Sequence, residues 1–235
     1  MKIKIYADGS DYDQIVNIYN NRSTNKISGF TTNPTLMRKS GISDYLGFAK
    51  NVLSVVKECP ISFEVFADDF DDMHRQAKIL SDLSSNVYVK IPVMNTKKQT
   101  SYNLIRELSN LGIKLNVTAV FTENQVDNVY RSLNTSIPAV ISIFGGRIAD
   151  TGINPTTSIL HAVTSKPSNN IEVLWASPRE VYNIYQANDI GCDIITVPSD
   201  LIAKFNELRG KDLEEYSLET VKMFYNDAVK AGFNL

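Results

Sequence analysis

The feature that most constrains the fold of this sequence is the regular alternation of short β-rich runs with stretches of helical period. Between the runs, segments 44–57, 71–81, 100–111 and 122–132 carry apolar side chains three and four positions apart, as amphipathic helices do. This pattern predicts strands and helices that alternate along the chain. The eight β-rich runs are residues 2–8, 27–33, 61–67, 87–93, 114–120, 139–145, 172–177 and 194–198.

Eight strand–helix units of roughly 25–30 residues each are what a closed parallel barrel requires. We therefore predict an α/β fold, a single (β/α)8 TIM barrel over residues 1–212, followed by an additional C-terminal helix over residues 213–235. An open doubly wound sheet is the alternative, but it usually has fewer strands and a glycine-rich phosphate loop after the first strand. Here the first run ends in Asp8-Gly9-Ser10.

Composition and charge exclude several classes of function. The formal net charge of −2 argues against a nucleic-acid or acidic-membrane partner, because such partners need a basic face. No apolar run is long enough to span a bilayer, and the first residues lack the apolar core of a signal peptide. The cysteines Cys59 and Cys192 and the histidines His74 and His161 lack the spacing of metal ligands. We expect a cytoplasmic protein without a metal.

Polar residues stand within the apolar runs and at their carboxyl ends, where a barrel enzyme places its active site. One polar residue in a strand carries little information, but a nearly complete ring of them predicts a site. In chain order, the ring consists of Asp8, Thr31, Asn33, Glu64, Lys90, Asn116, Thr118, Ser142, Arg147, Ser177 and Arg179.

Lys90 lies within an otherwise apolar run, where burying an ammonium group is costly unless it is paired or becomes neutral. A lysine that is neutral for part of the time can attack a ketone and form an imine. Glu64 and Asp8 would supply the carboxyl groups that move protons in such chemistry. Two alternatives stay open: a purely structural Lys90–Glu64 ion pair, and a plain cap or turn role for Asp8.

Arg147 and Arg179, together with Ser177, form a candidate phosphate clamp near the last strands of the barrel. The glycines at positions 145 and 146 would let the backbone approach a ligand closely. The alternative is that both arginines are ordinary surface residues in loops.

Four segments of the chain resemble the motifs of the transaldolase family. Residues 29–35 (Gly-Phe-Thr-Thr-Asn-Pro-Thr) resemble its N-terminal signature, and residues 89–92 (Val-Lys-Ile-Pro) resemble its Schiff-base lysine motif. Residues 144–148 (Phe-Gly-Gly-Arg-Ile) and 176–179 (Ala-Ser-Pro-Arg) resemble the two motifs on the phosphate side. The four segments stand in the family's order, and the resemblance covers most of the chain.

The resemblance implies a role for each residue of the ring. Lys90 would be the imine-forming nucleophile, and Asp8 would take the proton of the C4 hydroxyl during carbon–carbon cleavage. Glu64 and Thr118 would handle the water of carbinolamine formation and breakdown. No metal or organic cofactor would be needed, since the imine is the electron sink. The substrate-binding residues would be Thr31, Asn33, Asn116 and Ser142 at the dihydroxyacetone portion, Arg147, Ser177 and Arg179 at the phosphate, and Phe144.

The length of the chain is similar to that of the family's short subgroup, which also contains the fructose-6-phosphate aldolases. Those enzymes release free dihydroxyacetone and carry Gln and Tyr at the positions of Glu64 and Phe144, so these two residues, together with Asn116, favour a transaldolase that acts on sugar phosphates. Pro178 departs from the family pattern, which usually has an aromatic residue there, and could re-aim Arg179. Short-subgroup members form pentamers or decamers in which the C-terminal helix packs on a neighbour, so we expect a homo-oligomer. An aldolase and a non-catalytic phosphosugar-binding module are the alternatives.

Overall fold

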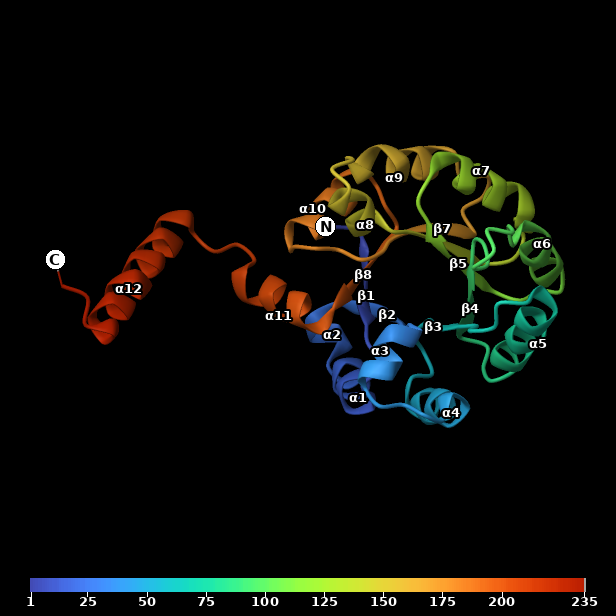
Figure 1. The fold of residues 1–235 in the computed structure, drawn as a ribbon, viewed down its shortest axis with the longest axis horizontal. Coiled ribbons are helices and arrows are strands. Elements are labelled where there is room, and N and C mark those ends of the chain that lie inside the picture. The colour runs from blue at the N-terminus through green and yellow to red at the C-terminus, as the bar shows by residue number, and fades with distance from the viewer. Residues whose placement is uncertain (235) are drawn as a thin grey trace. The chain divides into compact units, whose positions relative to one another are not determined.

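The computed structural model describes residues 1–234, which contain a closed barrel of parallel strands surrounded by helices (Figure 1). Each strand pairs with its neighbours in the chain, and β1 closes the barrel against β8. The predicted α/β fold, a (β/α)8 TIM barrel, is therefore confirmed. The strands are β1 (Lys4–Asp8), β2 (Ile27–Thr31), β3 (Ile61–Glu64), β4 (Val87–Pro92), β5 (Leu115–Val120), β6 (Ala139–Ile143), β7 (Ile171–Trp175) and β8 (Ile194–Pro198).

Helices fill the connections between successive strands, and they cover the outside of the barrel (Figure 1). A parallel pair of strands needs such a crossover, because the chain must return to the same end before the next strand begins. The connecting helices are α1 (Tyr12–Asn20), α2 (Arg22–Asn25), α3 (Pro34–Lys39), α4 (Tyr45–Val55), α5 (Phe70–Ser81), α6 (Tyr102–Asn110), α7 (Glu123–Ser132), α8 (Gly145–Asp150), α9 (Pro155–Thr164) and α10 (Tyr182–Asp189). After β8 the chain continues with α11 (Ser199–Leu208) and α12 (Leu213–Ala231).

Some strands end earlier than the sequence indicates, because the residues at their ends begin the next helix. β2 stops at Thr31 rather than at residue 33, and the Asn33 side chain instead accepts a hydrogen bond from the Leu36 N–H as the cap of α3. β6 stops at Ile143, since α8 already begins at Gly145. The short connections from β2 to α3 and from β6 to α8 keep the polar residues at the strand ends close to the mouth of the barrel.

Apolar side chains fill the barrel just beneath its carboxyl-terminal end. Side chains two residues apart along a strand share a face, so Tyr6 lies one layer beneath Asp8, and Val140 lies one layer beneath Ser142. The polar residues above this layer therefore line a mouth that has a packed floor. The buried cluster comprises Tyr6, Val140, Leu174, Ala176 and Ile194, with Tyr88 and Phe144 packed against it.

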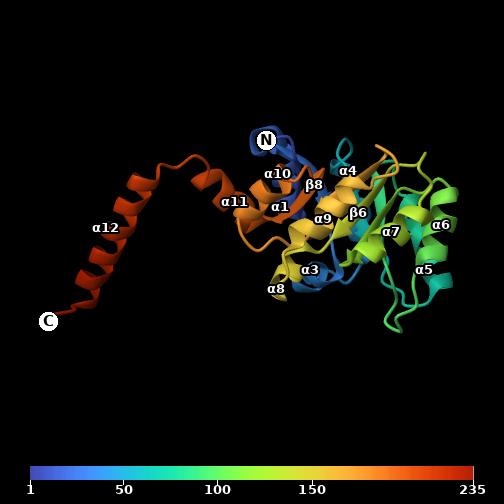
Figure 2. The same cartoon turned by 90° about the horizontal axis from the view of Figure 1, so that it is seen from above.

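The two ends of the barrel differ in what surrounds them. Helices α3 and α8 follow the carboxyl ends of β2 and β6, and Figure 2 shows both helices at one end of the barrel with the N-terminus at the other. The end where α3 and α8 lie, at the carboxyl ends of the strands, is the mouth, and a barrel enzyme holds its active site there.

The chain divides into two compact units, of which the first is Met1–Ile202 and the second begins at Ala203, within α11. The second unit contains α12, whose start is capped by Asp212 through hydrogen bonds from the N–H groups of Glu214 and Glu215. No residue of α12 is buried. Among the described residues, no helix combines the length and the apolar character that crossing a membrane requires.

Candidate active site

A cavity of about 540 Å³ opens at the mouth of the barrel. All of the predicted site residues except Asn116 line it, although they lie far apart in the sequence. The ring of polar residues inferred from the strand ends is thus brought together in space. The lining consists of Asp8, Thr31, Asn33, Glu64, Lys90, Thr118, Ser142, Phe144, Arg147, Ser177 and Arg179, together with Pro34, Thr35, Leu36, Lys39, Ala119, Ala176 and Thr196.

Lys90 lies on β4, in register with Glu64 on β3 and Asn116 on β5. Its Nζ atom is 2.9 Å from Glu64 Oε2 and donates a hydrogen bond of 2.8 Å to the Thr32 carbonyl oxygen. Only 8% of the Lys90 side chain is exposed, so water and salt screen this ion pair little. Lys90 and Glu64 therefore do form the ion pair that the structural alternative predicted. Both residues also line the cavity in which an imine would form.

Asp8 ends β1 directly opposite Thr31 of β2. The Thr31 hydroxyl donates a hydrogen bond of 2.7 Å to Asp8 Oδ1, and it shares a further short hydrogen bond with the Thr196 hydroxyl. Burial raises the pKa of the Asp8 carboxyl, and the positive charge of Lys90 opposes this rise without cancelling it. A raised pKa makes a carboxyl group a stronger base, which suits a group that must take up a proton and later return it.

The capping alternative for Asp8 is not supported, because another residue caps the following helix. The side chain of Asp11 accepts the hydrogen bond from the Gln14 N–H at the start of α1. Asp8 instead directs a carboxyl oxygen to Thr31 at the cavity wall.

A chain of hydrogen bonds crosses the floor of the cavity. Ser142 donates to Asn116 Oδ1 over 2.7 Å, and Asn116 Nδ2 donates to Ser62 Oγ over 3.0 Å. Asn116 is fully buried and lies beneath the cavity, where it fixes the Ser142 hydroxyl. The Thr118 hydroxyl, two residues further along β5, is buried without a hydrogen-bond partner among residues 1–234. Since an unpaired buried hydroxyl is costly, this group is suited to a ligand or a water molecule in the cavity.

The two arginines line the cavity from different segments of the chain, one in a helix and one in a loop. Arg147 belongs to α8, and its guanidinium carbon lies 5.5 Å from the centroid of the Phe144 ring. Arg179 follows β7 and pairs with Asp150, the last residue of α8. The two arginines are therefore neighbours, as a phosphate clamp requires, and one of them already has a carboxylate partner.

Pro178 does not turn Arg179 away from the cavity. Ser177 takes up the change of direction, because its backbone is left-handed with a φ of 61°. The Arg179 N–H then donates a hydrogen bond of 2.7 Å to Asn183 Oδ1, which fixes the backbone after the proline. Arg179 lines the cavity in spite of the departure from the family pattern.

Seven of the lining residues were not predicted as site residues, and Thr196 and Lys39 are the two with side chains best suited to bind a polar ligand. Thr196 is the polar residue inside the apolar run of β8, so the reasoning that found Thr118 on β5 would also have found it. Lys39 ends α3 and reaches the cavity only because that helix lies at the mouth. No local pattern in the sequence indicates this placement.

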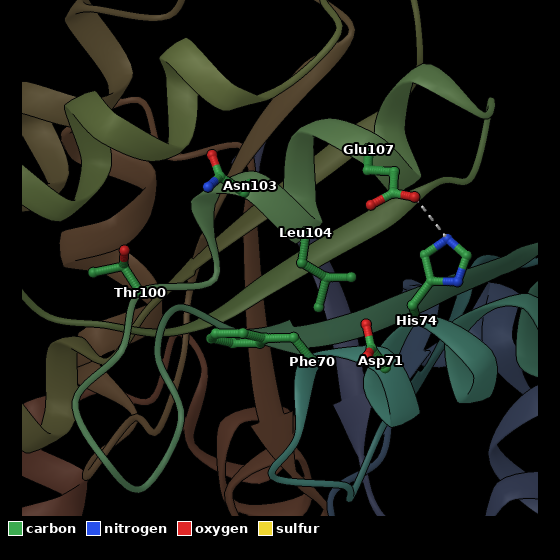
Figure 3. A pocket seen from close by; sticks show the side chains of 7 residues that line it. All are labelled: Phe70, Asp71, His74, Thr100, Asn103, Leu104 and Glu107. Atoms are coloured by element: carbon green, nitrogen blue, oxygen red, sulfur yellow. Dashed lines mark ion pairs between the residues drawn. The ribbon is translucent and has the colours of Figure 1, made fainter.

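The two histidines lie outside the mouth and pair with carboxylates. A hollow of about 330 Å³ lies between α5 and α6, and the distance from His74 Nε2 to Glu107 Oε1 there is 3.4 Å. Figure 3 shows the His74 ring pointing toward Glu107. His161 Nε2 lies 2.8 Å from Asp127 Oδ1. Within the part of the chain that the structure describes, no cluster of His, Cys, Asp and Glu side chains could hold a metal ion.

Residues 5–235 match the family described as Transaldolase/Fructose-6-phosphate aldolase. The chain belongs to this family. Similar curated proteins of the family carry the name "Probable transaldolase". One, from Brucella anthropi, is 31% identical and covers 98% of each chain; another, from Thermoanaerobacter sp., is 35% identical over 83% of this chain and 86% of the other. The match supports an enzyme with aldolase or transaldolase activity.

Solved structures of other enzymes share the fold of this transaldolase/aldolase family member. A 3-hexulose-6-phosphate synthase superposes with a TM-score of 0.60 and 12% identity, covering 89% of this chain and 98% of that chain. Thiamine phosphate pyrophosphorylase from Pyrococcus furiosus gives a TM-score of 0.55 and 12% identity, covering 86% of this chain and 88% of that chain. At such low identity, these likenesses concern the barrel alone.

Proposed function

We propose that this family member is a transaldolase, which transfers a dihydroxyacetone unit from a ketose phosphate to an aldose phosphate through a Schiff base on Lys90. The observation that carries the proposal is the position of Lys90 Nζ, 2.9 Å from Glu64 in a cavity that Asp8 also lines. Cleavage through an imine requires a nucleophilic amine, a proton acceptor beside it and a second carboxyl group at the reacting carbon chain.

The first half of the reaction forms the imine. Lys90 gives a proton to Glu64, and its neutral amine attacks the ketose carbonyl carbon to give a carbinolamine. Glu64 returns the proton to the carbinolamine oxygen, which leaves as water, and a protonated imine remains. The unpartnered Thr118 hydroxyl supports a role in holding this water.

The second half breaks and remakes a carbon–carbon bond. Asp8 takes the proton of the C4 hydroxyl, the C3–C4 bond breaks, and its electron pair moves into the imine to give an enamine on Lys90. The aldose phosphate departs, and the enamine carbon attacks the aldehyde of an acceptor aldose phosphate. Asp8 then returns its proton to the oxygen of the former aldehyde, which becomes the new hydroxyl, and hydrolysis of the imine frees the product. The raised pKa of Asp8 supports both proton transfers.

We assign the two ends of the substrate to different parts of the cavity. Thr31, Asn33 and Ser142 would hold the dihydroxyacetone portion, which needs hydroxyl and amide partners, and Asn116 would act through the Ser142 hydroxyl that it binds. Arg147, Ser177 and Arg179 would bind the phosphate, with Phe144 alongside, because a guanidinium fork matches phosphate oxygens.

Release of free dihydroxyacetone, the reaction of the fructose-6-phosphate aldolases, is the second candidate activity. Glu64 and Phe144 favour transfer, since the aldolases carry Gln and Tyr at these positions. The carboxylate of Glu64 supports this choice because it pairs with Lys90. A non-catalytic phosphosugar-binding module would bind the same sugars without turnover.

We also propose that the enzyme acts in the cytoplasm as a homo-oligomer, a pentamer or decamer, in which α12 packs on a neighbouring subunit. The helix supports this assignment because it buries none of its own residues and carries large apolar side chains all along its length. A helix that exposes several large apolar side chains within its own chain is normally covered by other protein.

Borohydride trapping tests the proposed function. The enzyme is incubated with fructose 6-phosphate and borohydride, and its intact mass is measured beside Lys90→Met. A reduced three-carbon adduct in the parent and none in the variant is expected. Lys166→Met is the matched control, because Lys166 is also a partly buried lysine with a carboxylate 2.9 Å away, on Asp193.

The outcome decides between the candidates. An adduct of equal mass in Lys90→Met would overturn the assignment of the nucleophile, and binding without any adduct would favour the non-catalytic module. Addition of erythrose 4-phosphate then separates the two activities, since a transaldolase should cleave the ketose much faster with this acceptor than without it.

A further inference from the structure

Arg179 is held by a carboxylate at the rim of the cavity. Its Nε atom donates to Asp150 Oδ1 over 3.0 Å, and a terminal nitrogen, Nη2, donates to Asp150 Oδ2. The pair therefore occupies one edge of the planar guanidinium group. The remaining N–H groups, on the other edge, have no part in it.

The short helix α8 brings the charged groups of this rim together. Arg147 and Asp150 are three residues apart in α8 and so lie on neighbouring positions of one helix face. The hydrogen bond from Arg179 and the charges of both arginines hold the pKa of the Asp150 carboxyl below its usual value. Asp150 thus lies as an anion among two cations, and it reduces their mutual repulsion.

The backbone that carries Asp150 is tied to the segment that carries Arg179. The Gly146 N–H donates a hydrogen bond to the Ala176 carbonyl oxygen, and Gly145 lies against the buried Trp175 ring. The start of α8 therefore has a fixed position relative to the end of β7. A carboxylate on this helix can define where the guanidinium of Arg179 points.

From this geometry we infer that Asp150 is a positioning residue, which holds one edge of Arg179 so that the other edge is ready for the phosphate group of a sugar substrate. The inference rests on the proposed function only in naming a sugar phosphate as the ligand. Arginine is suited to such a bridge, because its fork can bind a carboxylate on one edge and a phosphate on the other.

The opposite role, in which Asp150 competes with phosphate for Arg179, fits the geometry less well. Competition requires both anions to use the same edge, yet the Asp150 contacts leave the second edge unoccupied. The pair also contributes little to stability by itself, since about half of each side chain is exposed, 48% for Arg179 and 51% for Asp150. Its main physical effect is to limit where a long side chain can point.

Asp150→Asn tests the inference, because it keeps the size of the side chain and removes the charge and one acceptor. The KM for erythrose 4-phosphate should rise about tenfold, as expected for losing one oriented contact, with kcat within about twofold. The KM for erythrose, which has no phosphate, should not change. Asp150→Glu should recover part of the loss, which a general structural defect would not do.

Asp72→Asn is the matched control, because Asp72 also accepts hydrogen bonds from two nitrogens of an exposed arginine, Arg75, but lies on α5 away from the cavity. It should leave both KM values unchanged. Titration of inorganic phosphate into the parent and the Asp150 variants, followed by calorimetry, gives a second readout that needs no turnover. The parent should bind phosphate about tenfold more tightly than Asp150→Asn.

The results distinguish the inference from the proposed function. If Asp150→Asn leaves the KM for erythrose 4-phosphate and the Kd for phosphate unchanged, the positioning role is overturned. If the substitution lowers both constants, Asp150 competes with phosphate for Arg179 instead. If the parent lacks transaldolase activity, the proposed function fails, and the phosphate titration still tests the role of Asp150.

Discussion

Gly146 and Ser177 lie so close together that a Cβ atom at position 146 would meet the Ser177 carbonyl oxygen at 1.6 Å. No side chain can occupy that space unless the backbone moves, because real nonbonded contacts are about twice as long. The glycine therefore sets the distance between α8 and the segment after β7. The two arginines of the rim depend on that distance.

Gly146→Ala should accordingly disturb the rim. We expect a loss of about 3 kcal/mol in the free energy of unfolding, at the upper end of the range for overpacking, and weaker binding of phosphorylated substrates. Urea denaturation measures the first effect and phosphate titration the second. Gly9→Ala is the control, since a Cβ atom at position 9 would have no neighbour within 4 Å. Equal stability of the two variants would contradict the predicted clash.

The buried Asp8 carboxyl should make the stability of the protein depend on pH. Its pKa in the folded chain is raised, so the folded state binds the proton more tightly than the unfolded state does. The contribution of Asp8 to the free energy of unfolding is fully present below the pKa that Asp8 has in the unfolded chain. It is lost as the pH rises through the pKa that Asp8 has in the folded chain. Asp8→Asn has no carboxyl group to ionise, so the variant should gain stability relative to the parent as the pH rises above the ordinary pKa of an aspartate, about 4.

Unfolding free energies measured over this pH range would check the prediction. Asp68→Asn should show the opposite trend, because hydrogen bonds from Thr96 lower the pKa of the exposed Asp68 carboxyl. If the unfolding free energies of the parent and Asp8→Asn change with pH in the same way, the prediction of a raised pKa for Asp8 is wrong.

Thr31→Val should shift the pH profile of the reaction. The valine keeps the shape of the side chain but removes the hydrogen bond that lowers the pKa of Asp8. The pKa of Asp8 should therefore rise further, and the limb of the kcat/KM profile that needs ionised Asp8 should move to higher pH. The loss of the bond to Thr196 should also cost about 1–3 kcal/mol of stability. Thr31→Ser retains the hydroxyl and should behave as the parent does.

Glu64→Gln should destabilise the protein more when Lys90 is present than when it is absent. The single change leaves the Lys90 ammonium without its carboxylate partner at a nearly buried position, which typically costs about 3 kcal/mol. In the Lys90→Met background there is no ammonium group to leave unpaired, so the same change should cost much less. A double-mutant cycle of unfolding free energies measures the difference. Additive effects of the two changes would indicate that the pair is not coupled.

Replacement of an apolar residue on α12 should lower the mass of the proposed oligomer. Phe224→Glu places a charge on a side chain that is 63% exposed in the single chain and would be buried against a neighbour. Size-exclusion chromatography with light scattering should give a smaller assembly than the parent. Lys222→Gln, on the same helix, should leave the mass unchanged. A parent that already runs as a monomer would exclude the oligomer.

The fold and most of the site could be predicted because both follow from local periodicity. Alternation along a strand sends Lys90 and Asn116 into the barrel, and the parallel order of the strands puts their carboxyl ends at one mouth. The same reasoning extends to Thr196, a polar residue within β8 that the sequence analysis did not single out.

The contacts at the phosphate side could not be predicted in the same way. The pairing of Arg179 with Asp150 depends on where α8 begins, how tightly it packs on the next strand end and how Ser177 turns. None of these follows from periodicity. The sequence indicated two arginines and a proline in unusual positions, and only the three-dimensional arrangement reveals the carboxylate between them.

The two sides of the cavity, one around Lys90 and the other around the two arginines, lie on different kinds of secondary structure. Lys90, Glu64 and Asp8 stand on strands locked into the closed hydrogen-bonded ladder. The phosphate side stands on a helix of six residues and a single turn of loop. Loops accept substitution and insertion far more readily than barrel strands do. If the proposed roles hold, a lineage with this architecture can change which sugar it recruits by altering a few residues after β6 and β7, while the proposed nucleophile and its proton partners are inherited unchanged.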